Sequence, residues 1–486
     1  MELFFKSENA LNKIEKIRAF LLSEKWMAIL SCLAGVIMVL SHRFPEAELE
    51  IKGTIFFAYI IGIVIVLSKD VLAGLIPFML TYLIAIKCYD SFDKFMAYKW
   101  YAVPLVVMVL FHLIAYFKPL KAKGSQFVPM LFVSIAIVLG GVGFITPQEY
   151  FSGSSIYHML GLGFGMLLMY SYFYSHIEMN NKYLVTQKLV QIMVITGLMA
   201  SFMVFSYYLV KINHVLDIKG IIYMQWRNNC STILMITMPF AFLMANKHSY
   251  STVFGFLFYL AILLTGSRGG MVFGTIEVVM CIVLFILYDR RRRLGYIGIC
   301  FCVIVGVLAF APEITKFLGY TIDRLFTAVN DFLMGESTET RIKHYARGIS
   351  DFFNHPVFGT GLGYMGNRDV HPSKEFALCW YHCEPIQIAA SFGALGIAAY
   401  AYQFVKRNIL IWKKPTLFNM TIFLSYISLE MMSLVNPGIL CPLPYLMLIT
   451  LFMVVVEKCR DENQEKLYIS TKQRIQDALS QHKMKK

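Results

Sequence analysis

The sequence predicts an all-α fold, a polytopic transmembrane helix bundle of about 14 spans with one long helical extracytoplasmic loop. The chain is 58% hydrophobic and only 15% charged, whereas soluble proteins are about half apolar and about a quarter charged. The apolar residues lie in blocks of about 16–23 residues, and about 20 apolar helical residues cross a hydrocarbon core of about 30 Å. Because that core contains no water, the backbone must satisfy its own hydrogen bonds, as a helix does.

Each apolar block is expected to form one spanning helix. The predicted spans lie near residues 19–41, 54–68, 71–87, 101–117, 127–147, 155–175, 188–210, 230–246, 252–266, 271–288, 295–311, 384–404, 417–434 and 439–456. The second and third spans are short, and only Ser68, Lys69 and Asp70 separate them.

Basic residues indicate how the bundle is oriented. Of the 44 Lys and Arg, roughly 28 fall on one side of the predicted spans, which the positive-inside rule assigns to the cytoplasm. They include Arg290–Arg293, Lys406–Lys414, Lys118–Lys123 and both termini. In a membrane protein, cytoplasmic Lys and Arg residues and the binding of acidic lipid explain the net charge of +14. Nucleic acid is therefore not an expected partner.

This orientation divides the chain into five regions. They are a cytoplasmic amphipathic lead-in (1–25), a transmembrane bundle (26–311), an extracytoplasmic loop (312–383), C-terminal transmembrane spans (384–457) and a cytoplasmic tail (458–486). The loop is about 70 residues long, which is more than a connection needs and indicates a functional segment. The sequence of the loop predicts an amphipathic helix at Ile314–Leu333. It also predicts a second helix that starts at Ser337 or Thr338 and ends before Pro356.

Arg268 lies between the ninth and tenth predicted spans, in the run Ser267-Arg268-Gly269-Gly270. An arginine wedged between membrane helices is costly, and its guanidinium suits phosphate oxygens. A snorkelling arginine in a glycine-rich turn is an equally good explanation.

The second helix of the loop places Arg341, His344, Tyr345 and Gly348 on one face, at i, i+3, i+4 and i+7. Taken singly, Arg341 is better explained as part of a solvated helix face. The helix is followed by His355-Pro356-Val357-Phe358-Gly359-Thr360-Gly361-Leu362-Gly363, a proline stop and a glycine-dense turn.

His382 opens the twelfth span at the water–membrane boundary, where an imidazole is suited to act as a general base near neutral pH. A lone interfacial histidine is nevertheless more often a structural hydrogen-bonding residue. Glu384 either stabilises the helix N-terminus or orients His382. Cys379 and Cys383 are close enough in sequence for a disulfide, and a reduced pair is an equally good interpretation.

Trp226-Arg227-Asn228-Asn229 precedes the eighth span on the same side. Arg227 and Asn229 suit sugar hydroxyls or a phosphate, and they suit an ordinary helix cap equally well.

The ordered set of these motifs resembles the O-antigen ligase family, which also includes O-antigen and capsule polymerases. Ser267-Arg268-Gly269-Gly270 closes one span, and Arg341 and then the glycine-rich run follow in the long loop. His382 then opens a span that contains Phe392-Gly393-Ala394-Leu395-Gly396. The resemblance covers residues 260–400, and the N-terminal half matches only as a generic bundle.

The resemblance implies a glycosyltransferase that needs no metal ion and no other cofactor, works in the bacterial cytoplasmic (inner) membrane and has its active site in the 312–383 loop, facing outside. The donor would be an undecaprenyl-diphosphate-linked glycan, and the acceptor a glycan, lipid or protein. Arg268 and Arg341 would bind the diphosphate, and His382 would activate the acceptor hydroxyl. The expected substrate-binding residues are Arg227, Asn229, Ser267, Tyr345 and Glu384. Other polysaccharide-assembly proteins and the lipid bilayer are the remaining expected partners.

Polymerase and ligase differ only in the acceptor, and the sequence leaves both open, with a slight preference for polymerase because nothing marks a particular anchor. The alternative from another class is a transporter or flippase of lipid-linked sugars. Such proteins carry mid-span charges and repeated halves, whereas Glu277 and Glu430 are the conspicuous mid-span charges here. A receptor or scaffold predicts no dependence on the two arginines.

Overall fold

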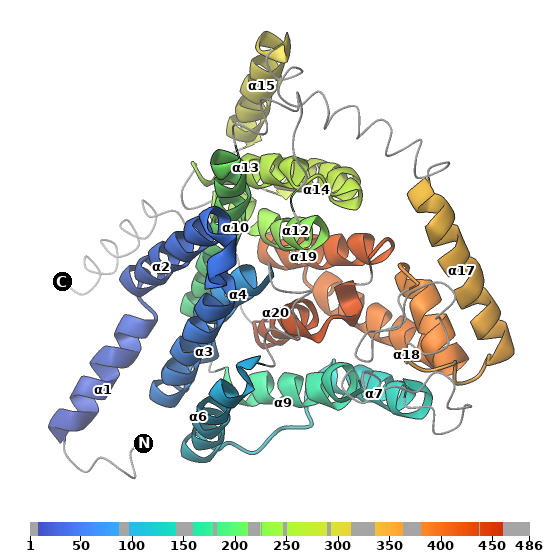
Figure 1. The fold of residues 1–486 in the computed structure, drawn as a ribbon, viewed down its shortest axis with the longest axis horizontal. Helices are drawn as coiled ribbons and strands as arrows, with labels where there is room; N and C mark the ends of the chain where they lie inside the picture. Colours follow the sequence, from blue (N-terminus) through green and yellow to red (C-terminus); the bar gives the residue numbers. More distant parts are fainter. Residues whose placement is uncertain are drawn as a thin grey trace, which may run out of the picture.

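A computed structural model describes residues 8–86, 97–141, 159–177, 182–211, 224, 226–245, 250–288, 293–312, 336–362, 381–436 and 438–459. All regular elements in these ranges are helical (Figure 1). The prediction of an all-α fold is therefore confirmed for the part of the chain that the structure describes. The predicted helix at Ile314–Leu333 and Cys379 lie outside these ranges.

The first half contains α1 (Glu8–Leu21), α2 (Glu24–Arg43), α3 (Leu49–Leu67), α4 (Val71–Ala85), α6 (Ala102–Ala115), α7 (Phe127–Gly141), α9 (Met166–His176) and α10 (Lys182–Val210). The second half contains α12 (Arg227–Met244), α13 (Ser251–Leu264), α14 (Arg268–Tyr288), α15 (Arg293–Ala309), α17 (Glu336–Asn354), α18 (Glu384–Trp412), α19 (Leu417–Ser433) and α20 (Met447–Lys458). Short 3-10 and π-helical turns join some of them.

A helix occupies each predicted span, but most of these helices are short. Among the described residues, five are long and apolar enough to cross a membrane: α2, α3, the Val185–Val210 part of α10, the Arg268–Leu287 part of α14, and α18. Other apolar helices, such as α13 and α15, are shorter. The count of about 14 spans therefore stays a prediction. The short predicted pair is two separate helices, because the Asp70 carboxylate accepts a hydrogen bond from the Leu72 N–H at 2.8 Å and caps α4.

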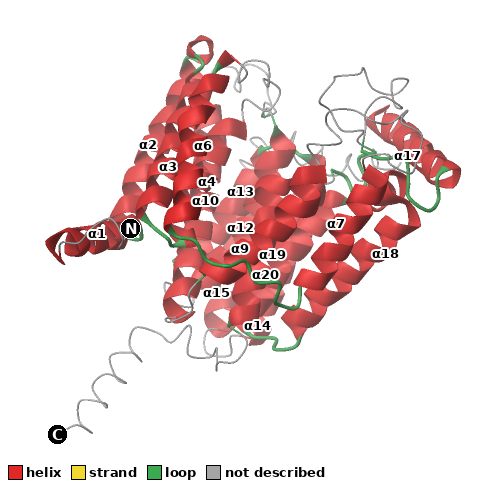
Figure 2. Ribbon diagram, turned by 90° about the horizontal axis from the view of Figure 1, so that it is seen from below, coloured by secondary structure: helices red, strands yellow, loops and turns green. Residues whose placement is uncertain are grey.

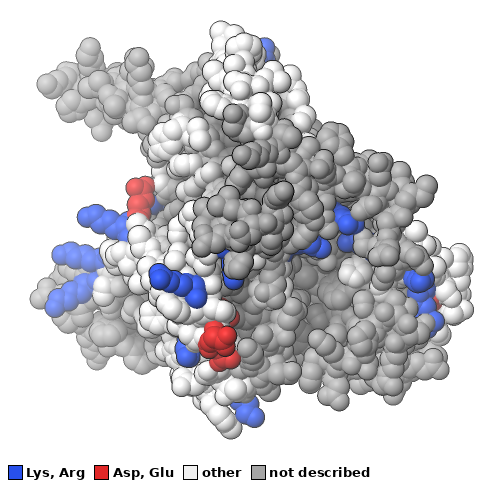
Figure 3. Space-filling view, turned by 45° about the horizontal axis from the view of Figure 1, so that its top comes forward, with Lys and Arg blue, Asp and Glu red and all other residues white. Residues whose placement is uncertain are grey.

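The core of the bundle is built around α12. Its side chains are buried from Cys230 to Leu243, on every face, as expected of a helix that is apolar all round. It lies near the centre of Figure 1, where α10, α13, α14 and α19 pack around it. Charged side chains occupy only small patches of the described surface in Figure 3, and most of that surface is neutral.

Helix α18 is interrupted, and the segment that follows α17 packs at the interruption. Gly393 has φ 63° and ψ −158°, so α18 is two helical pieces. The 356–361 segment lies in the break: Thr360 N–H donates to Ala390 C=O at 2.7 Å, and Ala394 N–H donates to Pro356 C=O at 2.8 Å. The segment thus supplies partners for backbone groups that the interrupted helix leaves without intrahelical bonds.

The glycine-dense run found in the sequence is explained by this docking. Gly359 and Gly361 have φ values of 73° and 89°, a region that favours glycine. Gly140, near the end of α7, lies at the same place, because a Cβ there would be 2.2 Å from the Phe358 carbonyl oxygen. The segment therefore holds α17 at one end of the bundle, beside α18 (Figure 2).

Candidate functional site

Helix α17 presents the face that the sequence predicts, and it packs on α18. Arg341 and Tyr345 are half-buried on this face, and His344 is only 1% exposed. Gly348 completes it, because a Cβ there would lie 2.5 Å from Ile386 and 2.9 Å from Tyr381. The glycine thus allows α17 and the start of α18 to approach closely.

His382 lies directly against this face. Its ring meets the His344 ring edge to face, with a centroid separation of 5.3 Å. The His382 backbone has φ 56°, a left-handed conformation that is uncommon for a residue with a Cβ. Strained residues of this kind cluster at functional sites.

Arg341, Tyr345 and Cys383 form the rest of this group. Burial raises the pKa of the Tyr345 phenol, the nearby Cys383 thiol raises it further, and the Arg341 guanidinium opposes the shift. Burial also raises the pKa of the Cys383 thiol, against a hydrogen bond with the Ile386 backbone. Both groups therefore stay protonated at neutral pH, and Arg341 provides positive charge near Tyr345. Arg341, Tyr345 and His382 are thus brought together by the packing of α17 on α18.

Tyr381 and Asp351 connect α17 to the residues directly before α18. Both are 1% exposed, and the Tyr381 hydroxyl donates to Asp351 Oδ2 at 2.6 Å. Sequence reasoning did not single out either residue. The available signal was weak: Asp351 lies seven positions after His344 on α17, and Tyr381 directly precedes His382.

Glu384 is buried at the first turn of α18. Its carboxyl lies close to the Glu430 carboxyl and to the Ser433 hydroxyl, both on α19. This placement connects the start of α18 to the end of α19.

Arg268 begins α14, and Ser267 caps that helix. The buried Ser267 hydroxyl accepts a hydrogen bond from the Gly270 N–H at 3.1 Å and donates to Asn228 Oδ1 at 2.8 Å. The turn therefore packs against the start of α12, where Arg227 and Asn229 are half-buried. Among the predicted substrate-binding residues, Ser267 and Glu384 are buried, whereas Arg227, Asn229 and Tyr345 keep partial exposure.

The end of α19 connects the two groups of predicted site residues. Glu384 contacts Ser433 there, and a Cβ on Gly269, next to Arg268, would lie 2.8 Å from Val435. Ser433 and Val435 are two positions apart. The residues of the α14 turn and those of the α17–α18 joint therefore lie at the same end of the bundle.

A comparison with family models gives a match over residues 253–401 to the family described as O-antigen ligase. This segment contains Arg268, Arg341 and His382, and covers less than a third of the chain. A comparison with curated proteins gives no significant match.

Proposed function

We propose that this chain transfers an undecaprenyl-diphosphate-linked glycan onto an acceptor hydroxyl. The match of residues 253–401 to the O-antigen ligase family supports a membrane enzyme of glycan assembly. The reaction takes place at the outer face of the bacterial cytoplasmic membrane. The acceptor is another lipid-linked glycan, a lipid or a protein. The observation that carries the proposal is the group formed by Arg341, His344, Tyr345 and His382, which lies within the matched domain.

The two arginines bind the donor diphosphate. Arg268 is the first residue of α14, and the backbone N–H groups at a helix N-terminus favour an anion. Arg341 adds a second planar donor from α17. Their positive charge stabilises the negative charge that develops as the diphosphate leaves, and in this proposal the charge comes from side chains rather than from a metal ion.

His382 acts as the general base. The acceptor oxygen forms a bond to the anomeric carbon while the bond from that carbon to the diphosphate oxygen breaks. The acceptor proton moves to the His382 imidazole, and the bonding electron pair leaves with the diphosphate. The transfer requires a neutral imidazole, and the ring of His382 is half-buried against His344.

The remaining predicted site residues fall into two groups, partly exposed residues that contact substrate and buried residues that support the fold. Tyr345, Arg227 and Asn229 are exposed enough to contact sugar hydroxyls or phosphate oxygens. Ser267 and Glu384 act through the fold, since Ser267 holds the α14 turn that carries Arg268 and Glu384 holds the start of α18.

The test compares Arg268→Ala, Arg341→Ala and His382→Ala with controls on the same elements. Lys343→Ala removes an exposed cation from α17, and His355→Ala removes a half-buried imidazole just beyond that helix. We expect His382→Ala to lower the transfer rate by about 10²–10⁴-fold and each arginine variant to lower it by about 10²–10³-fold. The measurement is glycan chain length and lipid-linked donor in cells, with protein level checked by immunoblot.

The site of donor accumulation separates the alternatives. The transferase requires donor to accumulate outside the membrane in the three variants, while both controls resemble the parent. Accumulation on the cytoplasmic face would instead support a flippase. Normal glycan in all three variants would rule out the proposed site.

A further inference from the structure

Resting on the proposed function, we propose that Tyr381 and Asp351 are positioning residues that hold His382 in place for proton transfer. We call the Tyr381–Asp351 hydrogen bond the latch. It crosses from the residue directly before His382 to helix α17, which carries Arg341 and Tyr345. The latch therefore connects the proposed base to the helix of the proposed diphosphate ligand.

Tyr381 is held on both of its polar sides. Its hydroxyl donates to Asp351 Oδ2 at 2.6 Å, and its backbone N–H donates to Gln387 Oε1 at 2.9 Å. The Gln387 amide donates in turn to the Ser391 hydroxyl at 3.0 Å. Asp351, Tyr381, Gln387 and Ser391 are all buried. Tyr381 thus links α17, through its hydroxyl, to the first two turns of α18, through its backbone N–H.

His382 needs such support because its backbone is strained. A left-handed conformation is unfavourable for a residue with a Cβ, and such conformations persist only when their surroundings impose them. Tyr381 fixes the chain before His382, and α18 begins two residues after it, at Glu384. The His344 ring and the close approach at Gly348 support the same arrangement from α17.

The latch is suited to positioning more than to stability. Arg347 Nε lies 3.2 Å from Asp351 Oδ1, so the buried carboxylate keeps a cationic partner when the tyrosine hydroxyl is removed. Tyr381→Phe therefore leaves no unpaired charge and changes little volume. We expect this variant to fold and to lose the alignment of His382.

The matched control lies at the other end of the bundle. The hydroxyl of Tyr170, a fully buried tyrosine, donates to Glu457 Oε2 at 3.0 Å. Tyr170→Phe removes the same kind of tyrosine–carboxylate bond, far from His382. The purified full-length chain is assayed for transfer, with kcat and donor KM determined separately. In parallel, diethyl pyrocarbonate modification of His382 is followed by mass spectrometry.

Tyr381→Phe is expected to lower kcat by about 10²-fold, the effect of displacing a reacting group by about 1 Å, with donor KM within about twofold of the parent. The modification rate of His382 should change as well. Asp351→Asn, which keeps an oxygen acceptor for the tyrosine, should retain more activity than Asp351→Ala. In a double-mutant cycle, Tyr381→Phe with Asp351→Ala should be no worse than Asp351→Ala alone.

Four outcomes would contradict the positioning role of the latch. Two concern Tyr381→Phe: unchanged kcat together with unchanged His382 modification, or a change in donor KM alone. The others are an equal loss of kcat in Tyr170→Phe and strictly additive effects in the double-mutant cycle. The modification assay needs no glycosyl transfer. If the parent chain transfers no glycan while Tyr381→Phe still alters modification of His382, the proposed function fails and the latch stands.

Discussion

At the scale of single residues, the contact between Gly393 and Val357 is a tight constraint in the C-terminal half of the chain. A Cβ on Gly393 would lie 2.4 Å from the Val357 carbonyl carbon and 2.5 Å from its oxygen. These are backbone atoms, which cannot rotate away as a side chain does. The φ of 63° and ψ of −158° also lie in a region that is essentially restricted to glycine.

Gly393→Ala should therefore destabilise the protein by at least about 2 kcal/mol, from backbone strain and overpacking together. The matched control is Gly306→Ala on α15, where a Cβ meets no atom within 4 Å and alanine is a better helix former. Thermal unfolding in detergent measures both variants. Equal melting temperatures for the two would contradict the docking of the 356–361 segment in the break of α18.

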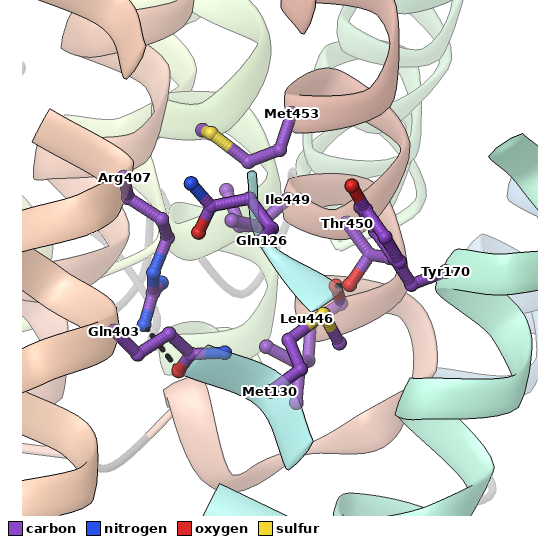
Figure 4. Close-up of a pocket in the computed structure, with 9 residues that line it drawn as sticks. All are labelled: Gln126, Met130, Tyr170, Gln403, Arg407, Leu446, Ile449, Thr450 and Met453. Atoms are coloured by element: carbon purple, nitrogen blue, oxygen red, sulfur yellow. Dashed lines mark hydrogen bonds between the residues drawn. The ribbon is translucent and has the colours of Figure 1, made fainter. Parts of the chain in front are cut away.

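At the scale of elements, α18 continues well beyond its predicted end near residue 404, to Trp412. This extension brings Arg407 inside the bundle, where it is only 3% exposed. Arg407 Nη1 lies 3.4 Å from Glu430 Oε1 on α19, and its Nη2 donates to Gln403 Oε1 at 2.8 Å. Figure 4 shows Arg407 and Gln403 beside a small cavity that Gln126 and Tyr170 also line.

Arg407→Ala should cost about 3–5 kcal/mol, because it leaves the Glu430 carboxyl in the bundle without its cation. Lys406→Ala, one position away and less buried, is the control. Replacing both partners, Arg407→Met with Glu430→Leu, should recover part of the loss. Thermal unfolding in the same detergent measures the stability of all three variants. A double variant no more stable than Arg407→Ala would show that loss of the ion pair is not what destabilises Arg407→Ala.

At the scale of the whole molecule, helix α7 runs from one end of the bundle to the other. Its end at Gly140 contacts the 356–361 segment, near the proposed site. The residues before its start lie near the end of α20, where the Ser125 N–H donates to Glu457 Oε1 at 2.6 Å. The basic loop that contains Lys118, Lys121 and Lys123 is therefore at the end opposite α17.

The positive-inside rule then predicts that α17 faces outside. In intact cells, a membrane-impermeant maleimide should label Ser350→Cys on the exposed surface of α17, and it should label Lys121→Cys only after permeabilisation. The parent chain provides the background from native cysteines. The reverse pattern would place the proposed site in the cytoplasm and would exclude transfer at the outer face.

The helical class and the positions of most helices follow from local composition. Apolar blocks must become helices in a membrane whatever they later contact, so the predicted segments and the helix after Ser337 agree with α2 to α20. The short pair at 54–68 and 71–87 was separable because Asp70 is a local cap. The resemblance to the O-antigen ligase family likewise rests on the linear order of motifs around Arg268, Arg341 and His382, and the family model matches the segment that contains them.

Contacts between residues distant in the sequence could not be inferred in this way. The docking of the 356–361 segment in α18, the Arg407–Glu430 pair and the latch each join residues whose local sequence is also compatible with loop, cytoplasmic or surface positions. Hydrophobic periodicity depends on neighbours a few positions apart, whereas these contacts depend on how helices pack. Residue type therefore indicated the chemistry of the proposed site, and packing of α17, α18 and α19 determined which side chains meet there.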